Sequence, residues 1–367
     1  MTLMNRAVFC AAFFPAATAL LAQSSRDALL SGVTAINSGG LPGVVLCTGP
    51  DAVPVVGAKC GKSVQPVAAA ATYGKGRAVA VGHPSFYTEE GVAKADTARF
   101  IRNAIGWLAG GDAVPAVAVY KDGGVAKALT SLEGLNVREI PSLDLLDRFN
   151  VLAVYPDKLA PDEVERVRAF VTGGGGLLVS GIGWGWQQVT RGKSLATENQ
   201  FNSLLGPAGL LINSDTAERT APEGYRADFP IPPSVNAAEA LRLAASGTVT
   251  DPETIRQINH TLCAVKPVLP PHETDLSRGL ADLMDAPNAS ATPTKDKPLK
   301  AADIAARGID VEHQTAWRAE PARDWPGHPG GPASPGLAPA DGPRGRRTLP
   351  VRLARPRWRR PGRGCAP

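Results

Sequence analysis

Short apolar runs and turn residues alternate over the first part of the chain. Gly74-Lys75-Gly76 is typical of a hairpin turn between two of these runs, and the runs lie at 43–47, 54–59, 67–73 and 77–83. Apolar residues then recur at helical spacing from Phe100 to Leu108, and Gly110-Gly111 ends that pattern. The sequence therefore predicts a β-rich segment over 40–82 that is followed by a helix.

Strand and helix patterns then alternate regularly. Helices are expected around Ala126–Leu132 and over 161–171, and buried-type strands over 114–120, 136–140, 150–156 and 176–180. The second helix carries Pro161 in its first turn, where the acidic residues Asp162 and Glu163 favour the positive end of the helix dipole. Strands alternating with helices of this length predict a parallel sheet covered on both faces, here an α/β domain over 83–215.

The remainder of the chain divides into three predicted parts. Residues 201–265 are mostly of helical pattern, and a proline-rich break at 267–271 precedes one more helix over 274–286, so we expect a helical extension over 216–285. Residues 286–315 have the composition of a linker. Residues 316–367 are dominated by Arg, Pro, Gly and Ala without apolar periodicity, which predicts a disordered tail.

Charge is distributed unevenly between the body and this tail. The formal net charge of the 367 residues is +5, but the eleven arginines of the tail exceed its three acidic residues by eight, so the rest of the chain is at −3. One interpretation of the tail is a basic arm for nucleic acid or a membrane. The favoured one is translation out of frame after residue 317, under which no nucleic-acid partner is expected.

The N-terminus has the layout of a secretory signal peptide. Arg6 precedes an apolar run from Ala7 to Ala22, and polar sequence begins at Gln23, so we expect a signal over 1–22 and a secreted or periplasmic protein. No later run reaches the length of a membrane span. Cys47 and Cys60 are compatible with a disulfide or with two separate buried thiols, and the absence of any C-x-x-C pair argues against structural zinc.

The stretch GGGGLLVSGIGWGW at 173–186 raises the question of catalysis. It does not satisfy the phosphate-binding G-x-G-x-x-G pattern, because residue 186 is a tryptophan. A strand followed by Gly-x-nucleophile-x-Gly is the frame of a nucleophile elbow, but Gly183 occupies the nucleophile position. An enzyme is therefore not expected. Ser180 with His83 leaves a hydrolase as the alternative.

At these residues the chain resembles a known family. AVAVGHPSFYT (78–88), AVYPDKLAPDEVERVRAFV (153–171) and the glycine stretch resemble the flavodoxin-like, class I glutamine-amidotransferase-like fold. More closely, over about 40–315, they resemble its degenerate form in the N-terminal regions of enhancin-like (peptidase family M-sixty) secreted proteins and of the transient-receptor-potential channel-associated factors. That resemblance implies an amidotransferase-like domain without a catalytic cysteine, in agreement with Gly183.

The peptidase activity of the enhancin-like proteins belongs to a separate module with an H-E-x-x-H zinc motif. His272-Glu273 is not followed by a second histidine at the required spacing, and no other histidine of the chain supplies the motif. The sequence therefore predicts no metal site and no cofactor, in a truncated pseudoenzyme that binds glycan or glycoprotein.

The candidate ligand site follows from the expected topology. In doubly wound sheets ligands bind beyond the carboxyl ends of the strands. Aromatic faces beside carboxylates and amides there suit sugar rings, and the candidates are His83, Tyr120, Asp122, Asp157, Trp184, Trp186 and Gln187. Each candidate also has a structural alternative. His83 is compatible with hydrogen bonding inside a turn, the two tryptophans with burial, and the two aspartates with turn or helix capping.

Overall fold

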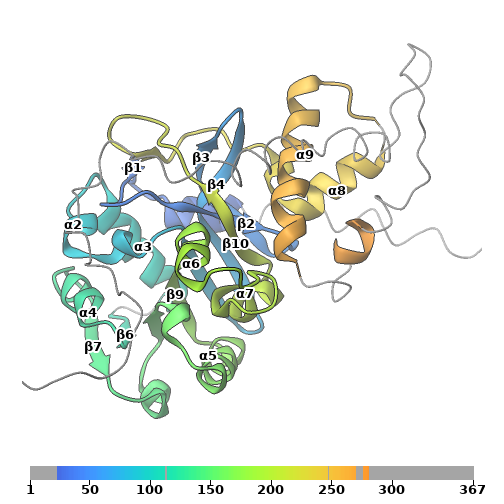
Figure 1. The fold of residues 1–367 in the computed structure, drawn as a ribbon. Helices are drawn as coiled ribbons and strands as arrows, with labels where there is room; N and C mark the ends of the chain where they lie inside the picture. Colours follow the sequence, from blue (N-terminus) through green and yellow to red (C-terminus); the bar gives the residue numbers. More distant parts are fainter. Residues whose placement is uncertain (1–22, 112–113, 247, 270–275, 281–367) are drawn as a thin grey trace, which may run out of the picture. The chain divides into compact units, whose positions relative to one another are not determined.

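The computed structural model describes residues 23–111, 114–246, 248–269 and 276–280. Their largest element is a seven-stranded sheet with the order β3–β4–β5–β9–β8–β6–β7 (Figure 1). Its strands are β3 (Ala52–Cys60), β4 (Ser63–Tyr73), β5 (Gly76–Val81), β6 (Ala116–Tyr120), β7 (Asn136–Ile140), β8 (Val151–Val154) and β9 (Gly176–Ser180). The β-rich segment thus continues the same sheet as the later strands.

The sheet is mostly parallel. β3, β4 and β5 pair antiparallel, whereas β5–β9, β9–β8, β8–β6 and β6–β7 are all parallel pairs. The hairpin between β4 and β5 turns at Gly74, whose φ of +63° suits glycine, as the sequence predicted. The expected β-α-β unit is also confirmed, because β8, α5 (Pro161–Gly173) and β9 follow one another and the two strands are neighbours.

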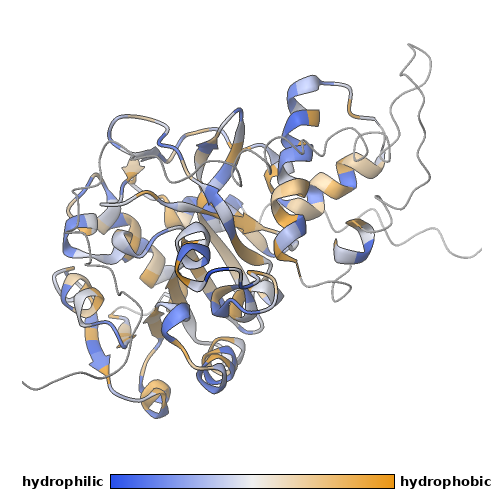
Figure 2. Cartoon of the chain, viewed as in Figure 1, coloured by the Kyte–Doolittle hydropathy of each residue, from blue (hydrophilic) through white to orange (hydrophobic). Residues whose placement is uncertain are grey.

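Helices cover both faces of the sheet, and this gives the domain two apolar cores. The first core includes Phe100 of α3 (Thr97–Leu108) and Leu129 of α4 (Gly123–Thr130). The second includes Val167 of α5 and Phe201 of α7 (Gln200–Leu205). Figure 2 shows the central strands in mostly apolar colours. The buried strands have the composition expected for a parallel sheet that water reaches from neither side.

Smaller elements complete the domain. Two strand pairs, β1 with β11 and β2 with β10, lie outside the main sheet. These strands are β1 (Ala35–Ile36), β2 (Gly43–Cys47), β10 (Leu210–Thr216) and β11 (Tyr225–Arg226). The further helices are α2 (Glu89–Val92), α6 (Gly183–Thr190), α8 (Ala237–Ser246) and α9 (Pro252–Val265), with 3-10 helices η1 (Pro84–Tyr87), η2 (Leu143–Arg148), η3 (Pro156–Lys158), η4 (Gly206–Ala208), η5 (Pro233–Val235) and η6 (Lys266–Val268).

β10 corrects the prediction that 201–265 is mostly helical. Its apolar part, Leu210 to Ile212, is short and carries no alternating pattern, so periodicity did not identify it. Tertiary contacts stabilise it as a strand: it pairs with β2, and the buried Asn202 accepts a hydrogen bond from the Ile212 amide at 2.8 Å and donates one to its carbonyl at 3.0 Å. The predicted helix over 274–286 is described only at 276–280, which are helical.

Cys47 and Cys60 are not joined to each other. Cys47 is buried at the end of β2, and Cys60 is half-buried at the end of β3, so the disulfide between them is not formed. Burial raises the pKa of both thiols above the ordinary range. The predicted signal at 1–22, the linker over 286–315 and the tail over 316–367 lie outside the described residues.

Candidate functional site

The carboxyl ends of the parallel strands bring most of the predicted site residues to one edge of the sheet. His83 follows β5, Asp122 follows β6, Asp157 follows β8, and the glycine elbow at 181–185 follows β9. Because these four strands are parallel neighbours, their carboxyl ends meet at the same edge. The sequence therefore placed these residues at one edge of the sheet as the structure has them, and their contacts decide what each side chain can do.

The elbow itself is closed by β10. A Cβ at Gly183 would lie 2.0 Å from the carbonyl oxygen of Asn213, and a Cβ at Gly181 would lie 2.6 Å from the Phe201 ring. Since real Cβ atoms do not approach backbone oxygen so closely, the nucleophile position has no room for any side chain. Glycine at residue 183 therefore serves the close packing of α6 against β10.

No hydrogen bond among the described residues joins Ser180 to His83, the pair of the alternative hydrolase. Ser180 is 2% exposed as the last residue of β9, where it is in register with Val81 of β5. The Nδ1 atom of His83 instead interacts with Ser85, whose backbone amide lies 3.0 Å away and whose Oγ lies 2.6 Å away. A buried serine without the histidine as its base is not an activated nucleophile.

His83 caps the 3-10 helix η1. Because a backbone amide only donates, the bond from Ser85 makes Nδ1 the acceptor and leaves the ring proton on Nε2. Burial lowers the pKa of His83 to about 4, so the ring is neutral at pH 7. The ring lies against Gly40, where an added Cβ would be 2.7 Å from it. His83 therefore has the structural role that the sequence left open, hydrogen bonding inside a turn.

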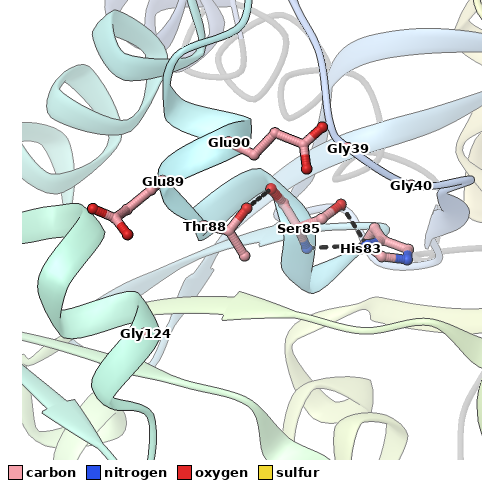
Figure 3. Close-up of a pocket in the computed structure, with 8 residues that line it drawn as sticks. All are labelled: Gly39, Gly40, His83, Ser85, Thr88, Glu89, Glu90 and Gly124. Atoms are coloured by element: carbon pink, nitrogen blue, oxygen red, sulfur yellow. Dashed lines mark hydrogen bonds between the residues drawn. The ribbon is translucent and has the colours of Figure 1, made fainter. Parts of the chain in front are cut away.

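An open hollow of about 420 Å³ lies beside this cap (Figure 3). The hydroxyls of Ser85 and Thr88 and the ring of His83 line one side of it, and the complete lining is Gly39, Gly40, His83, Ser85, Thr88, Glu89, Glu90 and Gly124. The two glutamates stand at its rim, and each pairs with a lysine, Glu89 with Lys127 and Glu90 with Lys94. The hollow therefore has both polar and apolar lining, and its ion-paired glutamates leave it close to neutral in charge.

Ion pairs fill the space between the ends of β6 and β8. Tyr120 donates to Glu163 at 2.6 Å, Lys121 donates to both oxygens of the same carboxylate at 2.8 Å, and Lys158 pairs with Asp122 at 2.6 Å. Burial acts to raise the pKa of Glu163, but the hydrogen bonds from Lys121 and Tyr120 outweigh it and lower the pKa to about 2. Tyr120 and Asp122 thus have partners within the protein.

Asp157 is a carboxyl group of this edge whose hydrogen bonding is incomplete among the described residues. Its Oδ1 accepts a hydrogen bond from Asn199 at 2.9 Å, whereas its buried Oδ2 has no hydrogen-bond partner among the described residues. Burial raises the pKa of this carboxyl to about 6, against the opposing hydrogen bonds from Tyr155 and Asn199. Asn199 in turn caps α7. Asp157 therefore connects η3 to α7 and titrates near neutral pH.

The tryptophans do not form an exposed aromatic platform. Trp186 is 7% exposed and belongs to the first core. Trp184 is half-buried, and its Nε1 is buried without a hydrogen-bond partner among the described residues. Gln187 is exposed on α6. The stacking surface expected for sugar rings is thus absent from the described part of this edge.

A second group of chemically active side chains lies elsewhere, and sequence reasoning missed it. The donor atoms of Cys60, Asp215 and His260 lie within 4.8 Å of one another. The three residues come from β3, β10 and α9, which are distant in the sequence. No local motif connects them, and the spacing rules applied to the cysteines could not find them.

The chain is therefore an α/β domain whose nucleophile elbow is closed by packing. Residues 14–227, more than half of the chain, match the family described as "TRPM8, N-terminal domain". The chain belongs to this family. The resemblance to channel-associated factors is thereby confirmed for these residues.

Similar proteins carry names that agree with this family. TRPM8 channel-associated factor 2 of Bos taurus is 30% identical over 188 residues, covering 50% of this chain and 19% of the relative. A TRPM8 channel-associated factor homolog of Danio rerio is 29% identical, covering 51% and 19%. TRPM8 channel-associated factor 1 of Homo sapiens is 32% identical, covering 44% and 17%. The matched region is thus about a fifth of the length of these relatives.

Solved structures with similar folds include two of the IMPa metallopeptidase. The complex with T-antigen has a TM-score of 0.47 at 15% identity and covers 78% of this chain and 37% of that chain. The metallopeptidase from Pseudomonas aeruginosa has a TM-score of 0.44 at 15% identity and covers 72% and 37%.

The family corrects the functional expectations. We expected a secreted or periplasmic protein that is the glycan-binding part of an enhancin-like protein. That expectation was wrong, because the relatives are named for association with a channel. The expectation of a glycan or glycoprotein partner is wrong for the same reason. The match begins at residue 14, inside the segment interpreted as a signal peptide, and that interpretation loses its support. No helix within the described ranges has both the length and the apolarity to cross a membrane.

Proposed function

We propose that this chain is a protein-association domain that binds a channel of the TRPM8 type and performs no chemistry at its elbow. The observation that carries the proposal is the family match over 14–227 to a domain of channel-associated factors. The relatives are named for association with TRPM8, and the chain covers about a fifth of their length. Association is therefore proposed for this domain rather than for the whole of a longer protein.

The chemistry of the carboxyl edge favours association over catalysis. Packing against Asn213 excludes a nucleophile at Gly183, and the cap on η1 engages His83. Tyr120 donates a hydrogen bond to Glu163 of α5, and Asp122 forms an ion pair with Lys158 of η3. An elbow in which each reactive position has a structural role retains the shape of an enzyme fold without its reacting groups.

The finer fold assignment is part of the same proposal. If β6, β7, β8 and β9 are counted as the first four strands, the sheet order becomes 2-1-3-4 with β5 in the fifth place. This matches the flavodoxin-like order, apart from the origin of the last strand, which precedes the others in the chain. The strand order thus supports a flavodoxin-like, amidotransferase-like domain over 83–215 that takes its fifth strand from the segment at 40–82.

The hollow beside His83 is the proposed contact surface. It combines hydroxyl groups, glycine backbone and a neutralised acidic rim, and Leu41 follows directly with 41% of its surface exposed. An exposed leucine beside a hollow that carries polar groups can anchor a partner segment, because binding energy concentrates in a few apolar anchors with polar surroundings. His83 would act here through its shape and its Nε2–H donor.

Co-precipitation of the full chain with TRPM8 tests the proposal. Wild type should capture the channel, and Leu41→Asp should reduce capture at least about fivefold, since losing one anchor costs over 1 kcal/mol. The matched control is Val114→Asp. Val114 is 61% exposed and precedes β6, at the opposite edge of the sheet.

Equal loss in both variants would place the contact elsewhere or indicate misfolding, which circular dichroism distinguishes. No capture by the wild-type chain would overturn the proposal.

A further inference from the structure

Three side chains with different metal-binding donors converge where α9 crosses the end of the β3–β4 hairpin. Cys60 is the last residue of β3, Asp215 lies near the end of β10, and His260 lies in the middle of α9. The Sγ atom, a carboxylate oxygen and a ring nitrogen lie within 4.8 Å of one another, and all three residues are half-buried. The convergence joins three elements that are separate in the sequence.

Hydrogen bonds outside the cluster hold α9 against the hairpin. Gln257, one turn before His260, accepts a hydrogen bond from the Val64 amide and donates to its carbonyl, both at 2.8 Å. Lys59, the neighbour of Cys60, exchanges two backbone hydrogen bonds with Glu218 at 3.1 and 2.8 Å. These bonds tie the hairpin end to the helix and to the chain beyond β10, so the donors are pre-positioned by the backbone.

Asp215 is aimed by local structure. The pairing of β10 with β2 changes register between Ile212 and Thr216, and such irregularities redirect side chains. Asn213 donates to Oδ2 of Asp215 at 2.7 Å and accepts from its backbone amide at 3.0 Å. A hydrogen bond to a carboxylate that leaves its other oxygen for an ion is the usual support of a metal ligand.

We propose that Cys60, Asp215 and His260 bind one divalent transition-metal ion of the zinc class. Thiolate, carboxylate and imidazole together suit borderline ions such as Zn²⁺ and disfavour Mg²⁺ and Ca²⁺. Ligand atoms around tetrahedral zinc are about 3.5 Å apart given bonds of about 2.0–2.3 Å, so small side-chain rotations would close the cluster. Water can supply the fourth ligand, as it does beside three protein ligands in open zinc sites.

The charge around the thiol is consistent with a cation. The carboxylate of Asp215 belongs to the cluster, so a negative charge lies beside the thiol of Cys60. A negative charge close to a thiol attracts a metal ion, and ion binding would displace the thiol proton to solvent. The ion would connect the hairpin, β10 and α9. Its three ligands are not among the candidate residues of the carboxyl edge, and the proposal does not rest on the proposed channel contact.

Titration of the reduced, chelator-treated full chain with Zn²⁺ alone tests the proposal by calorimetry. We expect one ion per chain, a rise in melting temperature and no response to Mg²⁺. Binding of Co²⁺ should add a thiolate-to-cobalt charge-transfer band, because the cluster contains one cysteine. Failure to bind a stoichiometric ion would overturn the proposal.

Variants assign the ligands. Cys60→Ser should abolish the cobalt charge-transfer band, and His260→Gln and Asp215→Asn should each weaken Zn²⁺ binding at least tenfold. Cys263→Ser is the matched control, because Cys263 lies on α9 outside the cluster, and it should bind like wild type. Melting curves without metal establish whether each variant folds; should Cys60→Ser not fold, His260→Gln and Asp215→Asn decide. Undiminished binding in the folded variants, or loss only in Cys263→Ser, would show that the ion binds elsewhere.

Discussion

The elbow after β9 and the Cys60–Asp215–His260 cluster differ in how sequence motif and side-chain chemistry are related. The elbow has the sequence frame of a catalytic turn, yet Asn213 of β10 occupies the space that a nucleophile would need. The cluster has no sequence frame, yet its three donors lie within 4.8 Å of one another.

β10 takes part in both. Its Asn213 carbonyl closes the elbow, and its Asp215, two residues later, completes the cluster. A motif describes backbone shape, whereas a site requires space and convergent side chains. Strand β10, which the hydrophobic pattern did not identify, determines both outcomes here.

The largest expected effect comes from restoring a nucleophile to the elbow. Gly183→Ser places a side chain against the Asn213 carbonyl and should destabilise the fold by about 3 kcal/mol without creating hydrolase activity. Chemical denaturation and an ester-reporter assay measure the two results.

Gly185→Ala is the matched control for that substitution. The nearest atoms to its Cβ would be those of Ile182, the residue before α6, at 3.4 Å, and alanine favours a helix over glycine by roughly 1 kcal/mol. Unchanged stability in Gly183→Ser, or serine-dependent ester hydrolysis by it, would contradict a closed elbow.

The next effect concerns the frame of the cluster. Gln257→Ala removes both hydrogen bonds to Val64 and should cost about 2–3 kcal/mol, because a partly buried amide and carbonyl lose their partner. It should also weaken Zn²⁺ binding, since α9 is then less firmly positioned. Gln187→Ala, on the exposed face of α6, should change neither quantity. Zinc affinity that is unaffected by a destabilising Gln257→Ala would separate the cluster from this frame.

The smallest effect tests the incomplete hydrogen bonding at the elbow edge. The folded-state pKa of Asp157 is about 6, above its ordinary 3.8, so the folded protein retains a proton that the unfolded chain has lost between these values. Stability should therefore fall as pH rises from about 4 to about 6. Asp157→Asn should be more stable than wild type by about 1–2 kcal/mol at pH 7 and equal to it below about pH 4.

Urea unfolding across this pH range measures that difference. Asp162→Asn controls for loss of a carboxylate at an exposed position nearby on the chain. A constant difference between Asp157→Asn and wild type at all pH values would show that Asp157 does not titrate as its burial implies.

Local patterns of the sequence were sufficient for the parallel half of the domain. The α5 helix begins at Pro161 as expected, because proline, two acidic residues and an apolar face all lie within a single helix. The hairpin at Gly74 and the β8–α5–β9 unit follow in the same way from turn chemistry and from a period of two or 3.6 residues. The glycine elbow and its lack of a nucleophile were equally readable in the sequence.

Only the tertiary structure decided what the candidate residues contact. His83 was readable as a residue at the edge, but Ser85 and Gly40 determine that it caps a turn. Trp186 was a candidate for the surface, and the first core buries it. The metal cluster required β3, β10 and α9 to meet, and periodicity carries no information about such meetings, because it reports which face of an element is buried and not what packs against it.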